Sequence, residues 1–142
     1  MASLTRQQID FMERPRVAHL ATVDATGQPH VLPVCYAAVR GAIYTPVDEK
    51  PKRVAAASLR RVRNIQARPR VCLVWDRYEE DWSRLAWLPV RGTAALVEAP
   101  DERAVALAAL RERYPQYRAM DLESRPLIKI TPLRVRWWAG TP

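Results

Sequence analysis

The sequence has few of the side chains that metal sites and thiol redox centres need. Its 142 residues include two cysteines, Cys35 and Cys72, and two histidines, His19 and His30. The cysteines are too few and too far apart for a disulfide scaffold or a C-x-x-C pair. Each lies in an apolar run, where cysteine usually behaves as a small buried hydrophobic residue. A zinc site would need nearly all four side chains, so we expect no metal site.

Signatures of several other protein classes are also missing. The chain has neither the G-x-S-x-G of serine hydrolases nor the G-x-G-x-x-G of dinucleotide-binding folds. No apolar run approaches the roughly 18–20 residues that span a bilayer. The first residues, MASLTRQQIDFMERPR, lack the apolar core of a signal peptide. We therefore expect a cytoplasmic protein with no membrane partner, and at about 100–200 residues per domain we expect one domain over residues 1–142.

Positive charge is what the sequence has in excess. Lysine and arginine number 23 against 15 acidic residues, which gives a net charge of +8 and a pI near 10.2. Such a surface attracts nucleic acid, acidic lipid or a phosphorylated small molecule. Many of the basic residues follow the turn D-E-K-P-K, at the start of a predicted helix. A solvated helix face is one interpretation, but a helix N-terminus beside ammonium groups also suits a phosphate.

Hydrophobic periodicity predicts a mainly β chain with helices on the outside. Strands are expected at 16–23, 30–36, 42–45, 71–75, 87–97 and 127–138, and helices at 5–13, 51–67 and 101–114. The first three strands have short loops and predict a meander. A slip in the alternation at Pro132 predicts a bulge in the last strand. About six strands with short connections indicate a small antiparallel barrel rather than a parallel sheet.

Several motifs then follow one another in a specific order. R-V-A-H-L-A-T-V-D-x-x-G-x-P-H-V-L-P-V forms the opening hairpin, and I-Y-T-P-V-D-E-K-P-K leads into a helix that ends R-N-I-x-A-R-P-R-V. A strand with two tryptophans closes the chain. This order resembles the pyridoxamine-phosphate-oxidase-like family of flavin and deazaflavin binders, and most of all its branch of oxidoreductases that depend on the deazaflavin F420. The resemblance covers nearly the whole chain and implies a six-stranded antiparallel split β-barrel with peripheral helices.

The resemblance also implies where the cofactor lies. The ring would cross the second and third strands, over Leu32, Pro33, Val34, Tyr44 and Thr45. The positions that hold the phosphate in the family correspond to Lys50 and Lys52, with Arg53, Arg60 and Asn64 further out. The proline between the lysines and the longer helix depart from the family pattern. Two ammonium groups beside helix N–H groups are physically suited to a phosphate, and a net charge of +8 favours the oligoglutamate tail of F420 over FMN.

The closing strand is expected to take part in assembly. Arg136 and Trp137 would approach the cofactor of a partner subunit, by resemblance to the family. Arg134, Arg136 and Trp138 alternate on one side of this strand, and Leu133, Val135 and Trp137 lie on the other. One set is expected to face its own barrel and the other to meet the partner. The expected assembly is a homodimer with its cofactor sites at the interface.

The function implied by the resemblance is an oxidoreductase that transfers a hydride between F420, or alternatively FMN, and a small organic substrate. The cofactor would supply the chemistry, and no side chain is assigned as acid or base; His30 lies near the expected ring but is more typical of a structural histidine. Two alternatives come from other classes. One is a non-catalytic carrier of flavin, F420 or haem. The other is a nucleic-acid-binding barrel, which the small number of aromatics in the basic segment disfavours, so no nucleic acid is expected.

Overall fold

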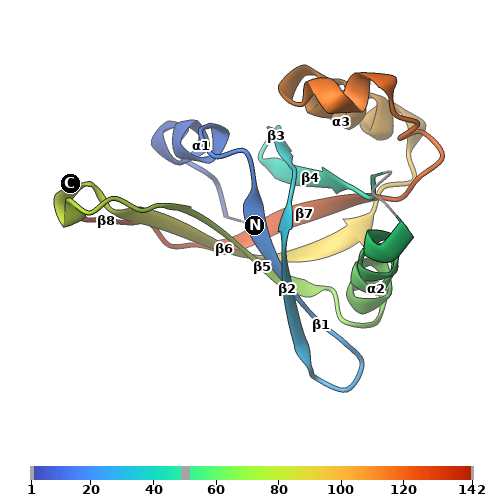
Figure 1. Cartoon of the computed structure of the whole chain (residues 1–142), viewed down its shortest axis with the longest axis horizontal. Helices are drawn as coiled ribbons and strands as arrows, with labels where there is room; N and C mark the ends of the chain where they lie inside the picture. The colour runs from blue at the N-terminus through green and yellow to red at the C-terminus, as the bar shows by residue number, and fades with distance from the viewer. Residues whose placement is uncertain (1, 49–51, 142) are drawn as a thin grey trace.

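The computed structural model describes residues 2–48 and 52–141, and for residues 52–59 it describes the backbone alone. The elements in chain order are α1 (Arg6–Glu13), β1 (Ala18–Val23), β2 (Pro29–Val34), β3 (Ala37–Val39), β4 (Ala42–Pro46), α2 (Lys52–Ala67), β5 (Arg70–Arg77), η1 (Trp82–Arg84), β6 (Ala86–Leu96), α3 (Pro100–Arg113), η2 (Pro115–Ala119), β7 (Leu127–Val135) and β8 (Trp138–Ala139). Figure 1 shows a curled sheet with the helices around it. No helix in the described ranges is long and apolar enough to cross a bilayer.

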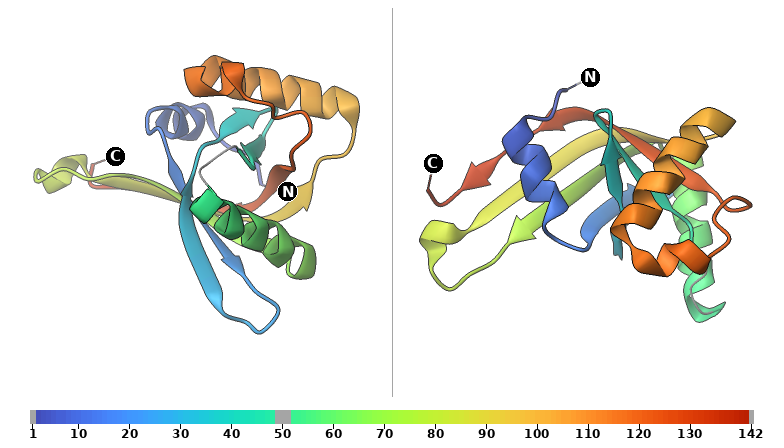
Figure 2. Two further views of the ribbon diagram at one scale, coloured as in Figure 1. Left: turned by 45° about the vertical axis from the view of Figure 1, so that its right-hand side comes forward. Right: turned by 90° about the horizontal axis from the view of Figure 1, so that it is seen from above.

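The strands form one antiparallel sheet in the order β2-β1-β5-β6-β7-β4-β3, and the short β8 pairs with β6. The two ends of this order, β2 and β3, are joined in the chain by Cys35 and Tyr36 alone. The chain itself therefore connects the two edges of the curled sheet, which is the split barrel that the sequence predicted (Figure 2). Within the described residues the sheet has eight strands rather than about six, because β3 was not expected and the expected closing strand 127–138 is divided into β7 and β8.

The expected three-strand meander is wrong. β2 pairs with β1, whereas β4 pairs with β3 and β7 and lies at the other end of the sheet. The predicted bulge is confirmed: Arg91 faces Arg134 but the next residue, Gly92, faces Pro132, so Leu133 is an extra residue on β7. This extra residue reverses the alternation of the strand, as the sequence indicated.

Apolar side chains form two clusters on the sheet. The larger one fills the inner face and includes Leu20, Leu73, Trp75, Leu88 and Ile130, all fully buried, with residues from α1 and α2 packed against them. The smaller cluster lies between β3, β4 and α3. The helix α1 begins with a capping box between Thr5 and Gln8, which satisfies the free N–H groups of its first turn.

Two tyrosines and one arginine hold the point where β2 becomes β3. The buried Tyr36 donates its backbone N–H to the hydroxyl of Tyr114 over 3.1 Å, and that hydroxyl donates to the carbonyl of Arg16 over 2.9 Å. Arg113 donates from Nε to the Tyr114 hydroxyl (3.1 Å) and from Nη2 to the Tyr36 hydroxyl (3.0 Å). The Tyr36 hydroxyl in turn donates to the carbonyl of Pro15 over 2.6 Å. These bonds join α3 to the start of β1 and to the turn that closes the barrel.

Replacing Tyr114 with Phe removes a hydroxyl that accepts two of these bonds and donates a third. Because the Tyr36 N–H would then lie buried without an acceptor, we expect Tyr114→Phe to lower the free energy of unfolding by about 1–3 kcal/mol. Urea denaturation followed by circular dichroism measures this difference. Tyr78→Phe is the matched control, since Tyr78 is 61% exposed. Equal losses in the two variants would show that the Tyr114 hydroxyl has no special role.

Candidate functional site

A cavity of about 370 Å³ lies between α2 and the hairpin formed by β1 and β2. Its walls are the side chains of Thr22, His30, Val31 and Leu32 from the hairpin and of Arg60, Arg61 and Asn64 from α2. One wall is therefore mainly apolar, and the other carries two guanidinium groups and an amide. No group of three or more potential metal-ligating side chains occurs in the described part of the chain.

The sequence places these groups together through two periodicities. In the hairpin, Thr22 lies opposite His30 and Leu20 lies opposite Leu32, so both pairs point to the inner face of the sheet. On α2, Arg60 and Asn64 are four residues apart and share one side of the helix. The Asn64 amide donates to the Thr22 hydroxyl over 3.0 Å, in a buried bond that joins the helix to the strand.

Arg61 is the most unusual residue of the cavity. It is only 6% exposed, and its Nε has no hydrogen-bond partner among the residues that the structure describes. Burial lowers the pKa of the Arg61 guanidinium, and the carboxylate of Asp48 offsets part of this effect. Asp48 accepts a hydrogen bond of 2.8 Å from the Tyr117 hydroxyl. A buried donor without an acceptor costs free energy, so the Nε of Arg61 is an unsatisfied donor at the wall of the cavity.

His30 is held by the turn of the hairpin rather than free in the cavity. Its Nε2 lies 3.3 Å from Oδ2 of Asp24. The other carboxylate oxygen of Asp24 accepts from the backbone N–H groups of Thr26 and Gln28 and from the Thr26 hydroxyl, over 2.6–3.0 Å. The hydrogen bond from the Thr26 hydroxyl, and next the one from the Gln28 N–H, hold the pKa of Asp24 well below its usual range. This arrangement fits the structural interpretation of His30.

Three of the predicted site residues line the cavity: Leu32, Arg60 and Asn64. Pro33 lies beside it on the opposite, exposed face of β2, and Val34 is buried in the main core. Lys50 lies outside the described residues. Lys52 and Arg53 form the start of α2, and their side chains are outside the description.

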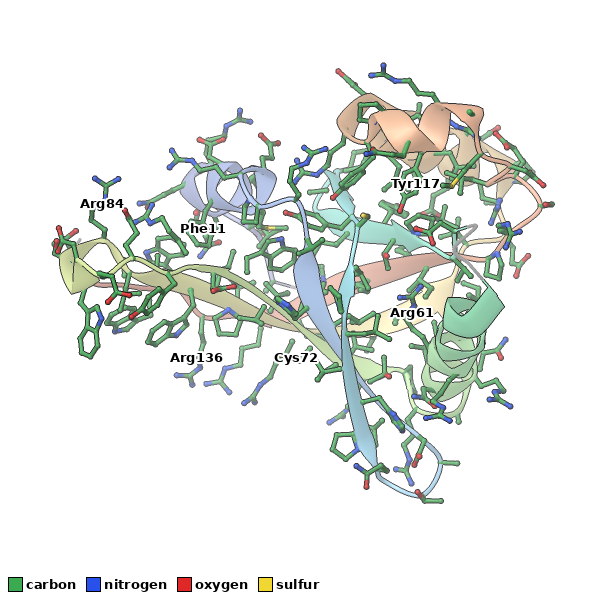
Figure 3. All side chains as sticks on the ribbon, viewed as in Figure 1. Phe11, Arg61, Cys72, Arg84, Tyr117 and Arg136 are labelled. Carbon is green, nitrogen blue, oxygen red and sulfur yellow. The ribbon has the colours of Figure 1, made fainter. Side chains whose placement is uncertain are left out.

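The remaining predicted residues lie elsewhere. Tyr44 belongs to the smaller core cluster, and its hydroxyl donates to Glu102 over 2.6 Å. Thr45 is fully buried, with a hydroxyl that has no partner in the described structure. Trp137 packs edge-on against Phe11, with ring centroids 4.8 Å apart. Figure 3 shows Arg136 and Cys72 on the face of the sheet opposite to Phe11.

The sequence analysis did not select Arg61 or Thr22 as site residues. The position of Arg61 in the helical pattern could have indicated its burial. Arg61 comes directly before the core residue Val62 and one helical turn before the core residue Ile65. Such a position lies at the border of the buried stripe. For Thr22, the alternation along β1 puts a hydroxyl among Ala18 and Leu20 on the buried face.

The hydrogen bonds of Asp24 predict how hairpin stability depends on pH. Since folding lowers the pKa of Asp24, its carboxylate stabilises the fold above its ordinary pKa of 3.8, and this stabilisation is lost as the pH falls. We expect the difference in unfolding free energy between the wild type and Asp24→Asn to be constant above about pH 5 and to shrink below pH 4. Urea denaturation at a series of pH values measures it. A difference that grows in acid would contradict the assignment.

The comparisons with known proteins identify the fold and the family. The family model described as "Pyridoxamine 5'-phosphate oxidase" matches residues 4–139. No curated protein matches. Among solved structures, conserved hypothetical protein Rv2991 from Mycobacterium tuberculosis is 23% identical, over 99% of this chain and 87% of that one, with a TM-score of 0.78.

Two other solved structures carry names that refer to ligands. HutZ, a haem storage protein from Vibrio cholerae, is 18% identical over 97% of this chain and 95% of its own, with a TM-score of 0.68. An FAD-binding protein from Mesorhizobium loti is 19% identical over 96% and 95%, with a TM-score of 0.67. These likenesses establish the shared fold, and the family model covers nearly all of the sequence. The chain belongs to the pyridoxamine 5'-phosphate oxidase family.

Proposed function

We propose that this protein is a homodimeric oxidoreductase that binds F420, or alternatively FMN, and transfers a hydride between the cofactor and a small organic substrate. The observation that carries the proposal is the buried Arg61, with its unsatisfied Nε, beside Arg60 and Asn64 in one cavity. A phosphate is the group that such a set of donors fits, because it offers several anionic acceptors to guanidinium and amide N–H groups.

The rest of the cavity suits the neighbouring parts of the same ligand. Val31 and Leu32 give an apolar wall beside the donors. The helix α2 begins at Lys52, so Lys52, Arg53 and the first N–H groups belong to the same end of the helix, about two turns before Arg60. A helix N-terminus with basic residues favours an anion. In this arrangement the phosphate lies along α2 and the ring extends toward β2.

The chain's own residues would bind and orient the cofactor, which supplies the hydride chemistry when bound. Arg60 and Arg61 would hold the phosphate, while Asn64 keeps the helix against β1 through its bond to Thr22. His30 stays attached to Asp24 and gives the cavity a fixed wall. No side chain is assigned to proton transfer.

The charge of the chain supports F420 over FMN, because F420 carries an oligoglutamate tail and the chain has a net charge of +8. The FAD-binding relative from Mesorhizobium loti supports a flavin-type cofactor in general. Haem is the ligand of other relatives, among them HutZ. A haem carrier therefore remains the alternative that the binding experiment has to separate.

The experiment is a titration of the purified protein with F420, FMN and haemin in turn, followed by absorbance and fluorescence. We expect F420 to saturate the protein at the lowest concentration. Saturation by FMN at a much lower concentration would overturn the choice of F420. Binding of haemin alone would overturn the oxidoreductase proposal and favour a carrier. Turnover with the reduced cofactor and a panel of quinones and enones then tests for catalysis.

The phosphate position predicts the effect of single substitutions on α2. We expect Arg61→Gln to weaken cofactor binding by about 1.5–3 kcal/mol, the usual contribution of a charge-assisted hydrogen bond, which is roughly ten- to a hundredfold in Kd. Arg60→Gln should act in the same direction. Arg63→Gln is the matched control, since Arg63 is an exposed arginine of the same helix and does not line the cavity. Fluorescence titration measures all three.

A double variant, Lys50→Ala with Lys52→Ala, tests the other part of the phosphate site. If the lysines hold the phosphate with Arg61, the double variant and Arg61→Gln should both weaken binding, and thermal unfolding of all variants should stay close to the wild type. Unchanged affinity in Arg60→Gln and Arg61→Gln would place the phosphate outside the cavity.

Assembly as a homodimer is supported by an exposed apolar surface on the arm formed by the far ends of β5 and β6 together with β8 (Figure 1). Trp87 and Trp138 stack there with ring centroids 4.1 Å apart, and each is 41% exposed. Val135 and Trp137 pack against the main core, which leaves Arg134, Arg136 and Trp138 facing outward. Tryptophan and arginine are enriched at interface hot spots.

We therefore expect Trp138→Gln to shift the protein from dimer toward monomer and to weaken cofactor binding with it. Size-exclusion chromatography with light scattering, run at several protein concentrations, measures the shift. Val105→Gln is the control, because Val105 is a similarly exposed apolar residue on α3, away from the arm. A folded monomeric Trp138→Gln variant that binds cofactor normally would refute a shared site.

A further inference from the structure

The buried Arg61 has an acidic neighbour that the proposed function does not use. Asp48 follows Val47 just after β4 and is 8% exposed. Val47 belongs to the same core cluster as Val62, which follows Arg61 on α2, so the segment after β4 and the helix pack together at this point. A buried charge without a counter-charge is strongly destabilising, and the carboxylate of Asp48 acts as the counter-charge of Arg61.

The carboxylate of Asp48 is also held by η2. Tyr117 is 3% exposed, and its hydroxyl donates to Oδ2 of Asp48 over 2.8 Å in a buried bond. Burial, and next the bond to Asp48, raise the pKa of Tyr117, so its hydroxyl keeps the proton and stays the donor at neutral pH. In the view of Figure 3, Tyr117 and Arg61 lie on either side of the end of β4. Asp48 therefore links η2 to the wall of the α2 cavity.

The orientation of this carboxylate decides what Arg61 can offer to a ligand. A carboxylate is a strong acceptor for guanidinium N–H groups, and Asp48 is close enough to act on the charge of Arg61. Even so, Nε of Arg61 has no acceptor among the residues that the structure describes. The bond from Tyr117 fixes the rotation of the Asp48 side chain. In this rotation Asp48 balances the charge of Arg61 and leaves its Nε open.

We propose that Tyr117 and Asp48 are positioning residues for Arg61. Tyr117 holds the carboxylate in the rotation that balances the buried charge without occupying Nε, and this donor is kept for a phosphate oxygen. The inference rests on the proposed function, because it takes a phosphate group as the ligand of Arg61. It adds that Asp48 stabilises the fold and at the same time weakens anion binding, since its negative charge lies close to that of the ligand.

Two substitutions should then change phosphate affinity in opposite directions. Asp48→Asn removes the negative charge and keeps the shape, so we expect it to tighten the binding of inorganic phosphate about three- to tenfold. Tyr117→Phe removes only the hydroxyl. The carboxylate is then free to turn to Nε of Arg61 and compete with the ligand, so we expect binding to weaken about three- to tenfold. Both variants should have a lower Tm, because each removes a buried polar contact.

The affinities are measured on the full-length protein by isothermal titration calorimetry with inorganic phosphate, and the stabilities by thermal unfolding without phosphate. Arg61→Gln shows whether the anion binds at Arg61, and it should weaken binding. Asp10→Asn and Tyr78→Phe are the matched controls. Asp10 is an exposed acidic residue of α1, and Tyr78 is an exposed tyrosine just after β5, so neither change should alter the affinity.

A double variant distinguishes positioning from a merely structural role. If Tyr117 acts through Asp48, Tyr117→Phe should weaken phosphate binding in the wild type and have no effect on it in the Asp48→Asn background. Two separate structural defects would instead weaken binding in each background, and this result would overturn the inference.

The single variants give further outcomes. Unchanged or weaker binding in Asp48→Asn overturns the inference, and so does unchanged or tighter binding in Tyr117→Phe. If Asp48→Asn does not fold, the Tyr117→Phe variant decides alone. Phosphate binding that Arg61→Gln leaves unchanged also overturns the inference, because the anion then lies elsewhere. Wild-type protein that binds phosphate at Arg61 but neither F420 nor FMN contradicts the proposed function and leaves the positioning of Arg61 supported.

Discussion

The turn at Cys35 and Tyr36 is the constraint on which the rest of the structure depends. Before this turn the chain forms β2, which pairs with β1. After it the chain forms β3, which pairs with β4 at the opposite end of the sheet. The backbone N–H of Tyr36 is bound by Tyr114 and its ring is covered by the guanidinium of Arg113, 4.7 Å from the centroid. Without this fixed turn, β2 and β3 would continue as one strand and the sheet would stay open.

The position of the α2 cavity follows from that turn. The chain after β2 pairs with β4 and no longer with β1. The β1–β2 hairpin therefore extends beyond the barrel, and its inner face is left for another element to cover. The helix α2 covers it, and the Asn64–Thr22 bond fixes the contact. Helix and hairpin do not fill the space between them completely, since His30 is held at the turn by Asp24. The remaining space is the cavity, with Arg61 buried at its wall.

The sequence was sufficient for the features that depend on neighbouring residues. The bulge beside Pro132 and the mainly β split barrel could both be predicted, the first from local periodicity and the second from motif order. The pairing of β4 could not, because it joins Tyr44 to Lys129 across most of the chain and depends on closure of the sheet. The sequence analysis expected the cofactor ring to lie over both Val34 and Tyr44. Because the sheet closes in this way, the two residues lie in two different core clusters.

The arginines of the chain show why net charge alone is a weak guide to a binding site. Much of the positive charge on α3 is structural. Arg103 donates to three backbone carbonyls of the segment between η2 and β7, and Arg111 donates to the carbonyls of Tyr117 in η2 and of Met120 just after it. A guanidinium has five N–H donors in a fixed plane, and it suits this task because a loop presents carbonyls in many directions. Such arginines are already satisfied and have little left to offer a ligand. The residues that matter for binding are those whose donors have no acceptor within the described structure, as at Nε of Arg61. Sorting the basic residues by their burial and hydrogen bonds rather than by their number therefore singles out Arg61, at the wall of the α2 cavity.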